Sequence, residues 1–115
     1  MSSDCLFCKI IKGEIPSKKA YEDDFVLAFD DISPQAPIHI IVIPKKHIAS
    51  LKEVSQEDEN LLGRVQVAVS KIAAKYPQLQ NGYRLVNNCG EDALQSVQHI
   101  HYHLLGGRKF SWPAG

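Results

Sequence analysis

The sequence predicts an α+β fold in which an antiparallel sheet is covered by helix on one side. Several short apolar or β-branched runs, bounded by prolines and turn residues, are typical of strands. One longer segment instead repeats its apolar residues at the spacing of a helix. The chain of 115 residues has the length of one domain, so we take residues 1–115 as a single domain.

The first expected elements are a short helix and two strands. The helix is expected over 5–12, where the apolar residues fall on one side and Gly13 can end it. Strands are expected at 25–29, which is apolar throughout, and at 38–43, which is β-branched and lies between two prolines. The connection 31–37 contains prolines, which exclude it from the interior of a ladder.

The one long helix is expected to begin after Ser55, a good N-cap, and to stop at Pro77. Acidic residues at 57–59 lie in its first turn, where the helix dipole favours them. Two further strands, at 83–87 and 98–105, complete the order helix, strands, helix, strands. The apolar residues at helical spacing are Leu61, Leu62, Val65, Val69, Ile72, Ala73 and Tyr76.

Composition excludes several classes of function. Thirteen basic residues balance thirteen acidic ones, which disfavours a protein that binds nucleic acid by bulk phosphate neutralisation. No apolar run approaches the roughly 20 residues that span a bilayer, so no membrane association is expected. The polar start Met1–Asp4 is unlike a signal peptide, and three cysteines without a signal indicate a reducing, cytoplasmic location.

The most informative segment carries His99, His101 and His103 in alternation with apolar or aromatic residues. On a strand these three side chains would share one face. A solvent-facing strand without a function would more often use Thr, Lys, Glu or Ser. Two chemical interpretations stay open: a metal site, because histidines two apart on a strand can share Zn²⁺, and covalent catalysis with imidazole as nucleophile.

The run 99–105 reads His-φ-His-φ-His-φ-φ, with φ apolar, and resembles the signature of the histidine triad superfamily. Within that superfamily the chain resembles the Hint branch of purine nucleoside phosphoramidases. The segments 29–37, 42–48 and 106–115 are similar to that branch as well, so the resemblance covers essentially the whole chain. It implies a five-stranded antiparallel sheet with one long and one short helix. It also implies a homodimer whose two sheets form one continuous ten-stranded sheet.

The resemblance implies a covalent mechanism. His101 would attack the α-phosphorus of a purine nucleoside 5′-phosphoramidate, such as nucleotidyl-lysine, and water would hydrolyse the nucleotidyl-histidine to the nucleoside monophosphate. The backbone carbonyl of His99 would accept the proton on the other nitrogen of His101. His103 would bind the phosphate oxygens, Ser96 would hydrogen-bond the phosphate or the leaving amine, and His39 would support the triad.

The resemblance also implies residues that bind the nucleotide. Asp31 is placed like a carboxylate that accepts both ribose hydroxyls, although a turn residue is an equal alternative from the sequence. Asn88 would contact the phosphate, and the backbone N–H groups around Leu94 and Gln95 would help to hold it. The residues implied to line the base pocket are Phe7, Ile10, Ile15, Phe29 and Ile32.

One segment departs from the branch. Where many Hint proteins have Gly-Gly before Gln-Ser, this chain has Ala93-Leu94. Leucine does not easily adopt a positive φ, so the phosphate loop is expected to differ if it needs that geometry.

Cys5 and Cys8 form a Cys-x-x-Cys pair, which by itself is only half of a zinc site. A subset of Hint-like proteins holds a structural zinc with such a pair and two histidines, and the matching residues are His47 and His99. The alternative is two buried thiols, with His47 as a loop residue. Cys89 is expected to take no part, and no organic cofactor is expected.

Two other functions remain open beside the phosphoramidase. One is a metal-dependent hydrolase in which the histidine triad holds a catalytic zinc ion. The other is a non-catalytic protein that binds a nucleotide or acts as a scaffold.

Overall fold

The computed structural model describes residues 4–115, so the first three residues of the polar start Met1–Asp4 lie outside the described part. Within that part the chain forms one antiparallel five-stranded sheet, two α-helices and four short 3₁₀ turns. The strand order is β1-β2-β3-β5-β4, which confirms the predicted antiparallel α+β architecture. The elements are α1 (Leu6–Ile11), β1 (Lys19–Glu22), β2 (Val26–Asp30), β3 (Ile38–Pro44), α2 (Glu59–Ala73), β4 (Tyr83–Val86) and β5 (Tyr102–Gly106), with 3₁₀ turns at Leu51–Glu53, Gln56–Asp58, Pro77–Leu79 and Glu91–Ala93.

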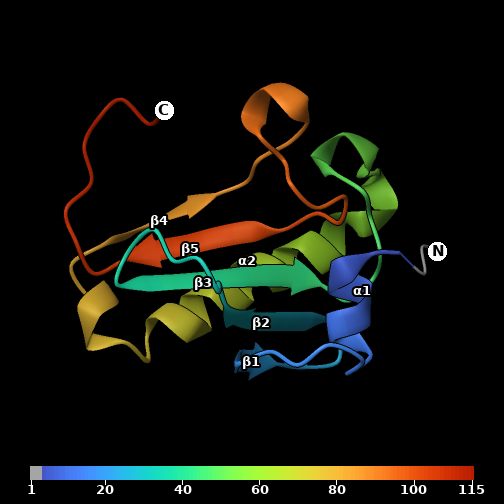
Figure 1. Cartoon of the computed structure of the whole chain (residues 1–115), viewed down its shortest axis with the longest axis horizontal. Coiled ribbons are helices and arrows are strands. Elements are labelled where there is room, and N and C mark those ends of the chain that lie inside the picture. Colours follow the sequence, from blue (N-terminus) through green and yellow to red (C-terminus); the bar gives the residue numbers. More distant parts are fainter. Residues whose placement is uncertain (1–3) are drawn as a thin grey trace.

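The two helices pack on opposite faces of the sheet (Figure 1). The α2 face holds the larger core, to which β3 contributes Ile40 and Val42 and α2 contributes Val65 and Ile72, all at most 1% exposed. The alternate residues of β2 and β3 face α1 and form a second, smaller cluster with its apolar side. No helix within residues 4–115 is long and apolar enough to cross a membrane.

The start of α2 is tied to the end of β3. The predicted N-cap Ser55 and Asp58 form a capping box, which closes a 3₁₀ turn before the α-helix begins at Glu59. The Asp58 carboxylate also accepts a hydrogen bond from Lys46 Nζ at 2.6 Å. Because Lys46 precedes His47, this contact fixes the segment that carries one of the predicted metal ligands. The α-helix ends at Ala73, before Tyr76, which was predicted to belong to it.

Two sequence predictions about strands need correction. The edge strand β1, at Lys19–Glu22, was not located from the sequence, because its mixed polar residues give no apolar pattern; pairing with β2 forms it. The strand predicted at 98–105 begins only at Tyr102, where pairing with β3 begins. Two of the three triad histidines, His99 and His101, therefore precede the ladder, and other contacts fix their positions.

Candidate functional site

One ring nitrogen of His101 makes a hydrogen bond, and the other has no hydrogen-bond partner among the described residues. The residue is 2% exposed, and its Nδ1 lies 2.7 Å from the backbone oxygen of His99. A carbonyl can only accept, so Nδ1 carries the proton and Nε2 keeps its lone pair. Burial lowers the pKa of His101 below the usual value, although the hydrogen bond to His99 opposes this shift. The side chain is thus a neutral imidazole with an available nucleophilic nitrogen.

A hydrogen-bonded chain also fixes the proton on His103. The backbone N–H of Gln35 donates to His39 Nδ1 at 3.0 Å, so the proton of the neutral His39 ring is on Nε2. His39 Nε2 lies 2.9 Å from His103 Nδ1 and donates to it, which leaves the proton of His103 on its own Nε2. The His103 ring centroid lies 5.2 Å from that of His101. His103 can therefore offer an N–H donor, which suits a negatively charged group, beside the His101 ring.

Burial lowers the pKa of both His39 and His103, and for His103 the neighbouring His101 and His39 lower it further. The folded chain therefore keeps His39 neutral at a pH where the unfolded chain, with a pKa of 6.5, has taken up a proton. Stability should fall as the pH drops below about 6.5, at up to ~1.4 kcal/mol per pH unit for each such histidine. Urea unfolding of the wild type and His39→Gln at several pH values measures this. Glutamine removes one titrating group and should make the pH dependence shallower; equal slopes would contradict the assignment.

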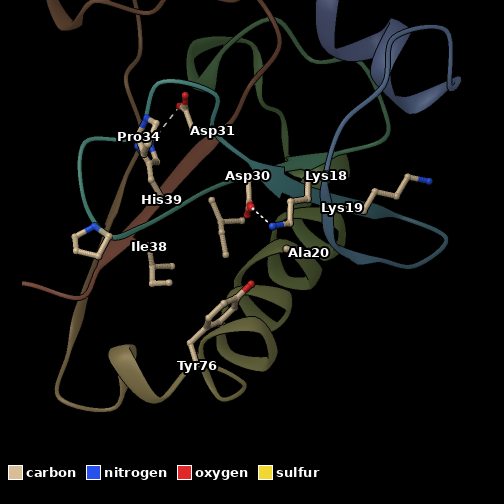
Figure 2. A pocket seen from close by; sticks show the side chains of 11 residues that line it. Lys18, Lys19, Ala20, Asp30, Asp31, Pro34, Ile38, His39 and Tyr76 are labelled. Carbon is tan, nitrogen blue, oxygen red and sulfur yellow. Dashed lines mark ion pairs between the residues drawn. The ribbon is translucent and has the colours of Figure 1, made fainter.

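The Asp31 carboxylate contacts both the backbone of its own turn and two histidine rings. Its Oδ1 accepts the backbone N–H of Ser33 at 2.7 Å, which is the turn that the sequence offered as the alternative role. Its Oδ2 lies 3.3 Å from His39 Nε2 and 4.0 Å from His103 Nδ1. Figure 2 shows the Asp31 carboxylate and the His39 ring pointing toward each other. The ribose-binding role of Asp31 stays a prediction.

Asp31, His39 and His103 are close enough to share a metal ion, but the protons do not suit one. Their donor atoms lie within 4.8 Å of one another. A ligating nitrogen must point a lone pair at the metal, whereas His39 Nε2 carries a proton because Nδ1 accepts from Gln35. The arrangement suits a hydrogen-bonded relay better than a catalytic metal centre.

The four predicted zinc ligands, Cys5, Cys8, His47 and His99, come together on the α1 side of the molecule. Cys5 Sγ and Cys8 Sγ lie 3.4 and 3.6 Å from His99 Nδ1. His47 Nδ1 lies 3.3 Å from Cys8 Sγ and 3.2 Å from His99 Nδ1. Tetrahedral bonds of about 2.3 Å to sulfur and 2.0 Å to nitrogen place ligand atoms roughly 3.3–3.8 Å apart, so the group fits Zn²⁺.

The protonation of His99 also suits a cation bound among the four predicted ligands. His99 Nε2 lies 2.8 Å from the backbone oxygen of Pro44 and donates to it, so Nδ1 faces the sulfurs with its lone pair. Burial lowers the pKa of His99 to about 4, which keeps that lone pair unprotonated. Burial, together with the neighbouring Cys5, raises the pKa of the Cys8 thiol to about 11. Metal binding here must displace thiol protons, and it will weaken as the pH falls.

The residues predicted to line the base pocket differ in exposure. Phe7, Ile10 and Phe29 are buried in the core on the α1 face, at 4%, 7% and 4% exposed. Ile15 is half-buried against the same cluster, whereas Ile32 is 98% exposed. A separate hollow of about 310 Å³ lies between β1, β3 and Tyr76 (Figure 2). Asp31 and His39, which contact His103, also line this hollow.

The loop 88–96 uses most of its predicted phosphate-binding groups internally. The backbone N–H groups of Leu94 and Gln95 donate to the oxygens of Glu91 and Gly90, and Asn88 Nδ2 donates to Ala93. The Gln95 side chain accepts from the N–H of Gly90 and donates to the oxygens of Ala49 and Val97. Ser96 is exposed and lines a hollow next to Cys5 and His47. The loop is therefore closed on itself and joined to the segment after His47.

Leu94 corrects the expectation that leucine would avoid a positive φ here. It has φ of 64° and ψ of 41°, in the left-handed region, and its side chain is 83% exposed. The hydrogen bonds of the loop impose this conformation, which costs an L-residue about 1–2 kcal/mol.

Replacing Leu94 by glycine should therefore stabilise the protein by about 1 kcal/mol, because glycine adopts this φ without strain. Urea unfolding would measure the gain. Leu94→Ala is the matched control, since it removes the exposed side chain but keeps the strained backbone. A gain of equal size in Leu94→Ala would show that exposure of the leucine, rather than its φ, was the cause.

Asn87 is a site residue that the sequence analysis missed. Its Nδ2 donates to the backbone oxygen of His101 at 2.9 Å. Its Oδ1 is buried and has no hydrogen-bond partner among the described residues. The signal that could have revealed it is strand register: Val86 pairs with His103, so the residue after β4 lies beside the segment that carries His101.

Comparisons with known proteins agree with this fold. The family model described as "Scavenger mRNA decapping enzyme C-term binding" matches residues 4–111. A HIT-like protein of Synechococcus elongatus is 52% identical over 115 residues, which cover 100% of both chains. A 14 kDa zinc-binding protein of Zea mays is 50% identical over 115 residues, covering 98% of this chain and 89% of that protein. The crystal structure of a HIT family hydrolase from Legionella pneumophila matches with a TM-score of 0.94 at 49% identity, over 97% of this chain and 100% of that chain.

Proposed function

The chain belongs to the histidine triad (HIT) superfamily and has the fold of a HIT family hydrolase, and we propose that it is a Hint-type phosphoramidase. Its substrates would be purine nucleoside 5′-phosphoramidates, including nucleotidyl-lysine, in which it cleaves the P–N bond. The observation that carries this proposal is the 2.7 Å contact between His101 Nδ1 and the backbone oxygen of His99, which assigns the proton to Nδ1 and leaves Nε2 without a hydrogen-bond partner among the described residues.

The proposed reaction has two displacements at phosphorus. Nε2 of His101 attacks the α-phosphorus as the P–N bond breaks, and the amine leaves with a proton taken up from solvent. The ring then carries a positive charge, which the Nδ1–H bond to the His99 oxygen stabilises. Water next attacks the same phosphorus and gives up a proton to solvent, while the electron pair of the breaking P–Nε2 bond returns to Nε2. This step releases the nucleoside monophosphate and restores the neutral ring. His103 Nε2–H would hydrogen-bond the phosphoryl oxygens as their charge grows.

The remaining predicted residues enter as proposals. Asp31 would bind the ribose and the apolar residues around α1 the base. Asn88, Leu94, Gln95 and Ser96 would bind the phosphate end, after the loop exchanges some internal hydrogen bonds for contacts to the ligand. Cys5, Cys8, His47 and His99 would hold a structural zinc ion, which supports α1 against the sheet rather than entering the reaction.

We also propose a homodimer. β4 is an edge strand whose outer side is unpaired within residues 4–115, so it can pair with a second copy and extend the sheet to ten strands. Sedimentation velocity should give twice the 12.8 kDa chain mass; a monomer would overturn this assembly.

The test of the function is to trap the covalent intermediate. Mixing the protein with a labelled adenosine or guanosine 5′-phosphoramidate and quenching in base should leave the nucleotide on His101, which peptide mapping can locate. Turnover without a trappable adduct would favour the metal-dependent hydrolase. Nucleotide binding with neither turnover nor adduct would favour the scaffold. The adduct separates these alternatives better than metal dependence, because a structural zinc ion can also affect turnover.

A further inference from the structure

The nucleophile's orientation depends on a segment that the sheet does not hold. His99 and His101 precede β5, which begins at Tyr102, so no ladder fixes the His99 carbonyl that binds His101 Nδ1. The backbone N–H of Ile100 donates to Ile48 at 2.6 Å and is one anchor of this segment. A second anchor is the hydrogen bond from Asn87 Nδ2 to the backbone oxygen of His101. Two more are on the His99 ring, where Nε2 donates to Pro44 and Nδ1 faces the sulfurs of Cys5 and Cys8.

The two cysteines of the predicted metal site also lie next to a second residue that contacts the His101 ring. Cys5 and Cys8 flank Phe7 on the first turns of α1, and the Phe7 ring is 4% exposed. That ring meets the His101 ring edge to face, at a centroid distance of 5.0 Å and an angle of 86°. It also meets the His99 ring, at 6.0 Å and 71°. The helix that supplies both sulfurs therefore also places the aromatic wall beside the nucleophile.

We propose that the cluster of Cys5, Cys8, His47 and His99 is a positioning element for His101, through which metal occupancy sets the fraction of His101 that carries its proton on Nδ1. His47 Nδ1 lies 3.2 Å from the unprotonated Nδ1 of His99 and 3.3 Å from Cys8 Sγ, which is the spacing of ligand atoms around one bound cation. Without the cation, the His99 ring loses one anchor, and α1 keeps only its apolar packing against β2 and β3. The carbonyl and the Phe7 ring can then both move away from His101. The effect on turnover rests on the proposed function, whereas the effect on the tautomer does not.

The first experiment uses the full chain labelled with ¹⁵N-histidine and needs no substrate. In the zinc-loaded protein, His101 should show one protonated nitrogen, Nδ1, and one unprotonated nitrogen, Nε2. After chelation of a protein that stays folded, both nitrogens should move toward averaged shifts, and the ring-current shift from Phe7 should shrink. Restored zinc should restore both signals. A folded, metal-free protein that keeps the single Nδ1–H tautomer would overturn the proposal.

A second arm decides the matter if chelation unfolds the chain. Cd²⁺ forms longer bonds to sulfur than Zn²⁺, so exchanging the ions should move the His99 carbonyl and shift the His101 Nδ1–H signal. An unchanged His101 signal, in a protein whose His99 signal does shift, would overturn the coupling. Cys89→Ser is the matched control, because it removes the cysteine outside the cluster and should leave the spectra unchanged.

Kinetics separate this inference from the proposed function. If the protein is a phosphoramidase, the folded metal-free form should lose about tenfold or more in kcat, as is common when a group that orients an active residue is removed. A tautomer that responds to metal in a protein with no phosphoramidase activity would leave the positioning role intact and reject the function. An active enzyme whose His101 tautomer does not respond to the metal would support the proposed function and reject the positioning role.

Discussion

Replacing His101 by alanine is expected to lower kcat for a nucleoside phosphoramidate by at least about 10³-fold, because the variant lacks the only nitrogen proposed to bond phosphorus. The substitution removes a 2%-exposed ring that contacts Phe7, so some loss of stability will accompany it. Steady-state rates measured well below the unfolding temperature separate the two effects. Binding of the nucleoside monophosphate should change only a few-fold, because other residues are proposed to hold the ribose and base.

Gln98→Ala is the matched control for this experiment. Gln98 is exposed and lies in the same segment, so its loss should leave both kcat and nucleotide binding unchanged. Turnover by His101→Ala at the wild-type rate would reject covalent catalysis at this residue.

Replacing Cys8 by serine is expected to cost about 5 kcal/mol of unfolding free energy, or about 20 °C in Tm, because it removes one of the four ligands of the proposed structural zinc site. The large effect follows from the place of the cluster in the fold. It joins α1 to the start of the His99 segment, and a chain of 115 residues has little other core to replace that link. Thermal unfolding with and without added zinc, and the metal content of the purified protein, give the measurement.

Cys89→Ser again provides the control, since Cys89 is outside the cluster and only part-buried. It should leave both Tm and the metal content unchanged. A Cys8→Ser protein with the wild-type Tm, or a wild type that chelators do not destabilise, would contradict a structural zinc ion here.

The sequence predicted elements well where apolar periodicity was strong. The central strands β2 and β3 and the helix α2 were located to within a few residues, because each buries a regular row of apolar side chains. β1 lacks such a row, since its polar side chains lie at the sheet edge and pairing with β2 alone defines it. β5 begins late because the ring and backbone of the His99 segment bind to loop and sheet atoms instead of a neighbouring strand.

The candidate site, like the fold, could be predicted only in part from the sequence. The Cys-x-x-Cys pair and the alternating histidines are visible in the sequence, and their resemblance to a known family indicated which residues would meet. Asn87 was missed because its role depends on the register of β4 against β5, which the sequence does not reveal. The left-handed conformation of Leu94 was not expected, because the hydrogen bonds that impose it come from Gly90 and Glu91 folding back on the loop.

The sequence by itself determined which chemical groups the protein has: imidazoles at alternate positions, a pair of thiols, and apolar runs that build the strands and helices. The prediction of helix on one side of the sheet was wrong, because α1 packs on the face opposite α2. Only the tertiary structure decided which nitrogen carries the proton in His39, His99, His101 and His103. The oxygens of His99 and Pro44 place protons on His101 Nδ1 and His99 Nε2, and the N–H of Gln35 fixes those of His39 and His103. Apart from the His99 oxygen, these partners are backbone atoms on other segments of the chain. Every residue supplies a backbone oxygen, and every residue except proline supplies a backbone N–H, so only the fold determines where these partners lie.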